Sequence, residues 1–166
     1  MIVFDASTLI LLAKTSLLET FLDASKLEAV APREVEREAC VEKQSVDAQI
    51  IRRLIGAGKI RVEVLSEHRL FDELRRDLGL GAGEAEAIAL AVTKRARFVA
   101  TDDGNAINAC KLVKLPFTSA LGILVRLREK GLVTRPEALL KLESLERFGR
   151  YKKSLVAAVR SQLEGI

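Results

Sequence analysis

Acidic residues that follow apolar runs are the side chains of this sequence best suited to chemistry. The apolar run 98–100 ends in a threonine followed by Asp102 and Asp103, and the run 2–4 ends in Asp5. Aspartate is a common turn former and helix cap, so these positions have an ordinary structural interpretation. Carboxylates just beyond the ends of strands are also how many α/β proteins hold Mg²⁺ or Mn²⁺. The sequence therefore offers two interpretations, a set of caps or a metal site.

Two glutamates border the apolar faces of predicted helices. Glu38 lies beside the stripe formed by Val35 and Ala39 on a helix that follows Pro32. Glu86 is on another predicted helix, where it stands beside alanines that should face the core of the protein. An exposed glutamate on an amphipathic helix is the ordinary interpretation of each. If the fold brings these acids to the strand-end aspartates, their repulsion would be relieved most simply by a divalent cation.

The elements that must position these acids alternate between strand and helix patterns. This alternation predicts an α/β fold, a three-layer α/β/α sandwich with a mainly parallel central sheet. The predicted strands are 2–4, 27–31, 60–65, 98–100 and 113–117. The predicted helices are 8–14, 17–22, one after Pro32, 46–55, 67–78, 84–95, 103–112, 119–130, 136–148 and 151–163. We expect a single domain over 1–166, with C-terminal amphipathic helices at about 136–164.

The composition is that of a globular protein. The chain has 166 residues, of which 49% are hydrophobic and 30% charged, so a substantial core is expected and disorder is not. Its apolar runs are short, which predicts neither a signal peptide nor a membrane span. Cys40 and Cys110 have no metal-binding or disulfide spacing and are expected to be buried. These features favour the cytoplasm.

Positive charge is concentrated in the C-terminal third. Residues 126–160 contain ten Lys or Arg against four Glu, whereas the rest of the chain sums to −2 within a total of +4. Such a region is able to follow a phosphate backbone, although a solvated helix face is the alternative interpretation. With six Phe, one Tyr and no Trp, the sequence shows no stacking platform for bases.

Other motifs in the sequence give weaker indications of function. The stretch GLGAG at 79–83 follows a predicted helix and has Glu84 where a dinucleotide-binding loop needs its third glycine, so it predicts a loop before a helix N-terminus that Glu84 stabilises. His68 is the only histidine, which leaves a catalytic triad or a zinc site with little support. A phosphoacceptor receiver domain would want an acidic pair near the first strand, where this chain has only Asp5.

The segments MIVFDAS, PREVERE, GAGEAEAIALA and VATDD, in this order, resemble the PIN-domain family of nucleases, which includes VapC-type toxins. The similarity covers roughly 1–132, and the stretch from GEAEAIALA through SALGILVRLREKGLV is most similar to a VapC-like prokaryotic subgroup. That subgroup has an Arg shortly after the acidic pair, where this chain reads GNAINACK. The resemblance implies a parallel α/β/α sandwich, a Mg²⁺ (or Mn²⁺) site and hydrolysis of RNA.

The resemblance also implies roles for particular residues. By motif position, the acids that bind metal and act in catalysis are Asp5, Glu38, Glu86 and Asp103. Ser7 and Thr101 occupy the small hydroxyl positions beside them, and Asp102 is expected to cap a helix or to support the ligands from behind.

The partners implied are RNA, an antitoxin protein and a second copy of the chain in a homodimer. The terminal helix adds a modest hint of dimerisation, because Leu155, Val156, Val159 and Leu163 share one stripe. The alternative function is a catalytically inactive PIN-type module that binds RNA or protein. All four expected acids are present, which argues against that alternative.

Overall fold

The computed structural model describes residues 1–41 and 43–166, and it contains one five-stranded sheet. The strands are β1 (Ile2–Phe4), β2 (Ala29–Pro32), β3 (Arg61–Glu63), β4 (Phe98–Ala100) and β5 (Phe117–Thr118). They lie in the order β3-β2-β1-β4-β5, and every neighbouring pair is parallel. The predicted α/β fold with a parallel sheet is therefore confirmed.

Helices connect successive strands and extend the chain beyond the sheet. In chain order they are α1 (Ala6–Lys14), α2 (Leu18–Ala24), α3 (Arg33–Glu36), the π-helix η1 (Arg37–Val41), α4 (Val46–Gly56), α5 (Arg69–Leu78), α6 (Ala82–Thr93), α7 (Gly104–Leu112), α8 (Ala120–Glu129), α9 (Arg135–Phe148) and α10 (Lys153–Gly165).

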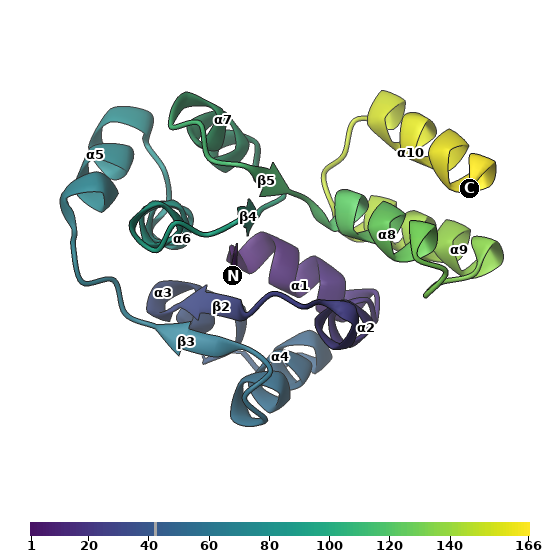
Figure 1. Cartoon of the computed structure of the whole chain (residues 1–166), viewed down its shortest axis with the longest axis horizontal. Helices are drawn as coiled ribbons and strands as arrows, with labels where there is room; N and C mark the ends of the chain where they lie inside the picture. The colour runs from purple at the N-terminus through teal and green to yellow at the C-terminus, as the bar shows by residue number, and fades with distance from the viewer. Residues whose placement is uncertain (42) are drawn as a thin grey trace.

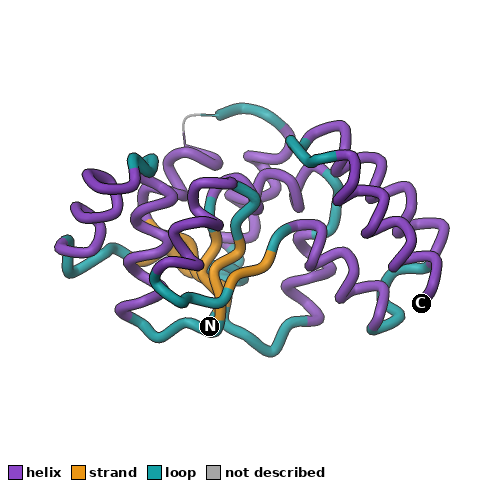
Figure 2. The backbone as a smooth tube through the Cα atoms, turned by 90° about the horizontal axis from the view of Figure 1, so that it is seen from above, coloured by secondary structure: helices purple, strands orange, loops and turns teal. Residues whose placement is uncertain are grey.

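The sheet lies between two layers of helices. Figure 1 shows α5, α6 and α7 on one side of the strands and α1, α2 and α4 on the other. The helix α6 contacts β1, β2 and β4, while α1 packs against α4 and also contacts α8 and α9. In Figure 2 the strands gather inside this shell, and α8, α9 and α10 form one end of the molecule. This arrangement is the predicted sandwich.

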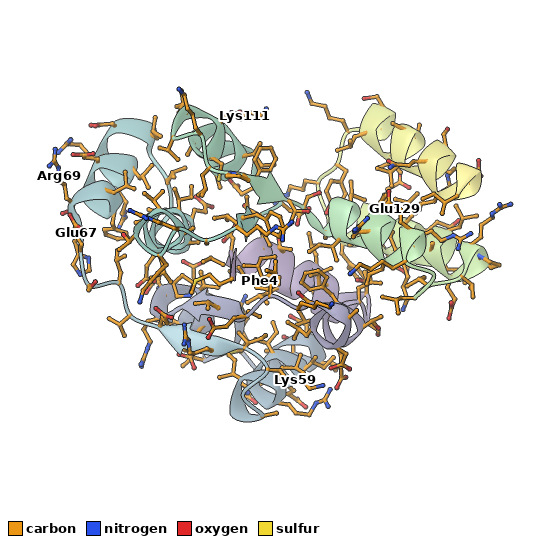
Figure 3. All side chains as sticks on the ribbon, in the orientation of Figure 1. Phe4, Lys59, Glu67, Arg69, Lys111 and Glu129 are labelled. Atoms are coloured by element: carbon orange, nitrogen blue, oxygen red, sulfur yellow. The ribbon has the colours of Figure 1, made fainter. Side chains whose placement is uncertain are left out.

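The core includes the apolar strands and helix α6, whose surface is apolar almost all round. Phe4 is fully buried near the centre of the molecule, whereas the charged Lys59, Arg69 and Lys111 lie at its periphery (Figure 3). Helix α6 is buried along 85–91, because its alanines let it approach the sheet closely. No helix in the described part of the chain is both long and apolar enough to cross a membrane.

The start of the last strand was predicted wrongly, and the helix after Pro32 has an unexpected form. The segment 113–115, predicted to begin the last strand, instead ends α7, where the Leu115 N–H donates to the Cys110 carbonyl and Lys114 adopts a φ of +55°. The strand β5 then begins only at Phe117. The predicted helix after Pro32 is present, and it changes to the π-helix η1 after one turn. Such π-turns are rare and often occur at functional sites.

Candidate metal centre

The strands β1 and β4 bring their following acids to one edge of the sheet. Phe4 pairs with Ala100 in parallel register, and the Asp5 backbone N–H donates to the Ala100 carbonyl at 2.9 Å. Asp5 and the segment Thr101–Asp103 therefore leave the sheet side by side. This carboxyl edge is where open α/β sheets bind their ligands.

The Asp5 side chain is buried and held by hydroxyl groups. It is only 3% exposed, and its oxygen Oδ2 accepts hydrogen bonds from Ser7 Oγ at 2.9 Å and Thr101 Oγ1 at 2.8 Å. Burial raises the pKa of Asp5, and the nearby charge of Asp103 acts in the same direction. The two hydroxyls expected beside the acids thus fix the orientation of the most buried one.

The two carboxylate oxygens of Asp103 have different surroundings. Its Oδ1 accepts the backbone N–H groups of Asn105 at 2.8 Å and Ala106 at 2.9 Å, which caps the start of α7. Its Oδ2 makes no hydrogen bond with any residue that the structure describes. The cap holds the carboxylate in place and leaves one oxygen for a ligand.

Asp102, by contrast, is fully engaged with the protein. Its carboxylate accepts hydrogen bonds from Thr8 Oγ1 at 2.6 Å, Tyr151 Oη at 2.5 Å and the Ala120 backbone N–H at 2.9 Å. Burial and the adjacent Asp102 charge raise the pKa of Tyr151, which keeps its hydroxyl a donor. Asp102 thus helps to cap α8, because it accepts the N–H of the first residue of that helix. The cap of α7 is Asp103.

Glu38 reaches the edge from η1. Its Oε1 accepts the Gly83 backbone N–H at 3.2 Å. A Cβ on Gly83 would lie 2.7 Å from Glu38 Oε2, so the glycine lets this carboxylate lie against the start of α6 in its present position. The pKa of Glu38 is raised by burial and by the charge of Asp5. The π-turn itself is stabilised from outside, since Arg52 Nη1 donates to the Cys40 carbonyl at 2.5 Å.

Glu86 lies apart from these acids. It is 8% exposed, and its Oε2 accepts the Glu34 backbone N–H at 2.7 Å, near the start of α3. Burial raises the pKa of Glu86, and the charges that act on it are those of Glu34 and His68. The structure does not bring Glu86 to Asp5, Glu38 or Asp103.

Glu84 is the acid of α6 that joins the cluster. Burial raises its pKa most, and the charges of Asp103, Asp5 and Glu38 raise it further. Glu84 lies in the first turn of α6, as predicted, and its Oε2 also accepts the Gly81 N–H at 2.8 Å, which caps the helix. Two positions in an α-helix differ by about 200° around the axis, which is why Glu84 and Glu86 point to different neighbours. The pattern of buried alanines on both sides of this pair gave no signal to choose between them.

The donor set fits a hard divalent cation. It consists of the carboxylates of Asp5, Glu38, Glu84 and Asp103, and three of them have a raised pKa because burial disfavours their charge. Oxygen ligands without His or Cys suit Mg²⁺ or Mn²⁺ rather than Zn²⁺. In the described residues, no three acidic, His or Cys side chains are already close enough to hold an ion as they stand. A bound cation would draw them together and offset their repulsion.

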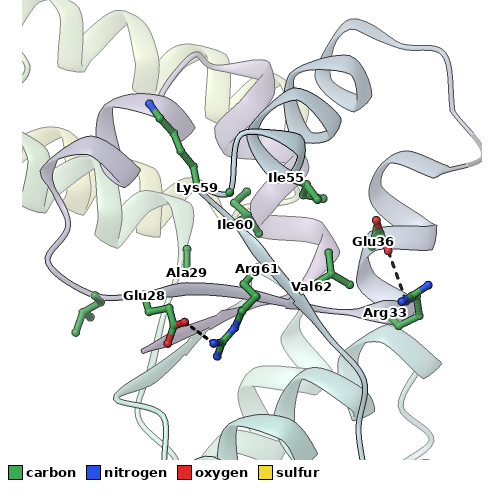
Figure 4. A pocket seen from close by; sticks show the side chains of 11 residues that line it. Glu28, Ala29, Arg33, Glu36, Ile55, Lys59, Ile60, Arg61 and Val62 are labelled. Carbon is green, nitrogen blue, oxygen red and sulfur yellow. Dashed lines mark ion pairs between the residues drawn. The ribbon is translucent and has the colours of Figure 1, made fainter.

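A hollow of about 590 Å³ beside β2 and β3 has a different character. Figure 4 shows that two of its cations are paired, Arg61 with Glu28 at 2.8 Å and Arg33 with Glu36 at 3.7 Å. Lys59 is paired with an aspartate of α2. None of the four clustered acids lines it. This hollow therefore offers neither free charge nor the metal ligands.

A comparison with known protein families is consistent with the acidic residues at the carboxyl edge of the sheet. The chain matches the family described as "PIN domain" over residues 1–164, so it belongs to the PIN-domain family. The fold and the general nuclease character of that family fit the arrangement at the carboxyl edge. No curated protein and no solved structure matches the chain significantly.

Proposed function

We propose that this protein is a Mg²⁺- or Mn²⁺-dependent ribonuclease that hydrolyses phosphodiester bonds of RNA. The observation that supports it most is the convergence of Asp5, Glu38, Glu84 and Asp103 at one sheet edge in a PIN-domain chain. No Lys or Arg in the described residues forms an ion pair with Asp5, Glu84 or Asp103. Unneutralised carboxylates at a ligand-binding edge are the electrostatic arrangement that a divalent cation completes.

In this proposal Asp5, Glu84 and Asp103 hold the cation, and Glu38 orients the attacking water or holds a second cation. A bound divalent cation supplies positive charge beside the scissile phosphate. Ser7 and Thr101 act through Asp5, because their hydroxyls fix its Oδ2 and leave the other carboxylate oxygen to the ligand. The water attacks phosphorus, the bond to the leaving ribose oxygen breaks, and the strand is cut.

The basic C-terminal third supports RNA as the substrate. Arg147, Arg150, Lys152 and Lys153 are exposed and make no ion pair with the described residues. Contacts of such side chains with phosphates bind any sequence, and they make affinity fall with salt by a slope of about −0.7 per phosphate on a single strand.

The experiment is cleavage of a mixed RNA panel by wild type and Asp5→Asn, with Mn²⁺ and with a chelator. We expect cleavage only by the wild type with metal. Cleavage that persists in Asp5→Asn or with chelator would contradict the proposal. RNA that is bound but never cut would instead favour the non-catalytic binding module.

A toxin role, an antitoxin partner and a homodimer are further proposals that rest on the family resemblance. Val156, Val159 and Leu163 of α10 are buried within the chain, and only Leu155 of that stripe is exposed, at 47%. The independent hint of dimerisation is therefore weaker than the sequence alone indicated. Light scattering at micromolar concentration tests the dimer, because a mass of 18.2 kDa would be that of a monomer. Growth arrest by wild type but not by Asp5→Asn tests the toxin role.

A further inference from the structure

A second hollow, of about 390 Å³, adjoins the acids and differs from the first in its lining. It lies between α1, the residues after β4 and the connection between α9 and α10. Its volume is typical of sites that bind small ligands. Its lining includes Ser7, Leu11, Asp103, Gly104, Phe148 and Arg150. One wall is thus a proposed metal ligand, and the facing wall comes from the basic C-terminal third.

The facing wall combines an aromatic ring with one cation, and a second cation, Lys14 of α1, lies over the ring. Phe148 is 45% exposed, so much of its ring is open to a ligand. The Lys14 ammonium lies 5.3 Å from the centre of its ring, and the Arg150 guanidinium makes no hydrogen bond or ion pair with a described residue. An exposed ring beside an unpaired guanidinium is a combination that holds single-stranded nucleic acid, because the ring stacks a base and the cation binds a phosphate.

The wall is fixed in place from behind. Tyr151 donates its hydroxyl to Asp102 at 2.5 Å, which fastens the α9–α10 connection to the residue before Asp103. Gly149 lets the Tyr151 ring pack against the backbone here, since a Cβ at this position would lie 2.4 Å from Tyr151 Cε2. The ring of Phe148 and the acid Asp103 are therefore held at a set spacing before any ligand arrives, which lowers the cost of binding one.

Building on the proposed ribonuclease function, we propose that this hollow binds one nucleotide of single-stranded RNA beside the scissile bond, with its base stacked on Phe148 and a phosphate on Arg150. The ring cannot reach the face of a base that is stacked in a duplex, so the site selects single strands. Every base has a π face, so the site tolerates any base.

Binding is measured separately from cleavage, by fluorescence anisotropy of a labelled single-stranded oligouridylate with a chelator present. We expect Phe148→Ala to weaken binding by about tenfold or more and Phe148→Trp to restore it. Arg150→Gln should weaken binding and reduce the salt slope by about 0.7. Leu140→Ala, an exposed position on the same helix, and Arg95→Gln, beyond the far end of α6, are the matched controls and should bind like wild type.

Each outcome separates the two proposals. Binding by Phe148→Ala and Arg150→Gln that equals wild type would overturn the nucleotide site, as would a wild type that does not bind the strand. If Phe148→Ala binds weakly but wild type cuts no RNA with Mn²⁺, the nucleotide site stands and the hydrolytic function fails. If wild type cuts and both variants bind normally, only the nucleotide site fails.

Discussion

The acids after β4 and the acids at the start of α6 invite comparison, because each place holds two carboxylates within two residues of each other. After β4, Asp102 is taken up by three protein donors, whereas Asp103 keeps an oxygen free of described partners. On α6, Glu86 binds the backbone near α3, whereas Glu84 shares the electrostatic field of Asp5 and its neighbours. Residue type is the same within each pair, and only the neighbours differ.

This difference shows how the fold assigns roles to equivalent side chains. A carboxylate whose oxygens accept hydrogen bonds from the protein has less left to offer a ligand. A carboxylate that is partly buried among other acids is destabilised until a cation arrives. One member of each pair therefore supports the structure, and the other is available for the proposed chemistry.

The comparison after β4 is tested by Asp103→Asn against Asp102→Asn, with the largest effect expected. Asparagine keeps the cap of α7 but weakens a metal ligand, so Asp103→Asn should lower RNA cleavage by about 100-fold or more. Asp102→Asn should retain substantial cleavage and lose about 1–3 kcal/mol of unfolding free energy, because its donors lose acceptors. Cleavage rates and urea unfolding measure both, and the reverse ranking would break the comparison.

The comparison on α6 is tested by Glu84→Gln against Glu86→Gln. In each variant the amide carbonyl still accepts the backbone N–H, so the pair differs only in where the negative charge is lost. We expect Glu84→Gln to lower Mn²⁺ affinity by about tenfold or more and Glu86→Gln to leave it near wild type. Calorimetric titration decides between them. A greater loss of Mn²⁺ affinity in Glu86→Gln would show that Glu86, the acid that the sequence motif indicated, is the metal ligand.

A smaller effect is expected when the space for Glu38 is filled. Gly83→Ala places a Cβ within 2.7 Å of Glu38 Oε2, so the carboxylate must move while the helix remains intact. We expect about a tenfold fall in Mn²⁺-dependent cleavage with unfolding free energy changed by less than about 1 kcal/mol. Gly56→Ala is the control, because a Cβ there meets nothing within 4 Å. Equal cleavage by the two variants would show that the position of Glu38 is unimportant.

The smallest expected effect concerns stability without metal. Burial raises the pKa of Asp5 above its ordinary 3.8, so the folded protein holds that proton more tightly than the unfolded chain. The stability contributed by the protonated form is complete below pH 3.8 and is lost as the pH rises through the folded pKa. With chelator at neutral pH, Asp5→Asn should therefore unfold a few degrees higher than wild type. Differential scanning calorimetry measures the shift, and a lower midpoint for Asp5→Asn would contradict it.

The sequence predicted the strand-end acids because local pattern determines where they lie. Apolar runs at 2–4 and 98–100 form neighbouring parallel strands, and parallel strands share a carboxyl edge. The sequence cannot distinguish Glu84 from Glu86 as the acid of the proposed site, because α6 is apolar on both faces and no stripe marks which side of the helix meets the other acids. The π-turn at η1 is contacted by Arg52 from another helix, and such a contact leaves no periodic signal in the chain. The late start of β5 follows from a backbone bond that closes the end of α7, from the Leu115 N–H to the Cys110 carbonyl, and an apolar run does not reveal it.

The bond from Tyr151 to Asp102 spans 49 residues of sequence, and this separation sets an order of events during synthesis. Chains are made from the N-terminus, so β1, α6 and β4 leave the ribosome before the residues that fasten the far wall of the second hollow. While that wall is missing, the strand edge exists without Phe148, Arg150 or the hydroxyl that steadies Asp102. A nascent chain therefore completes the second hollow only after Tyr151 and the residues before it have left the ribosome.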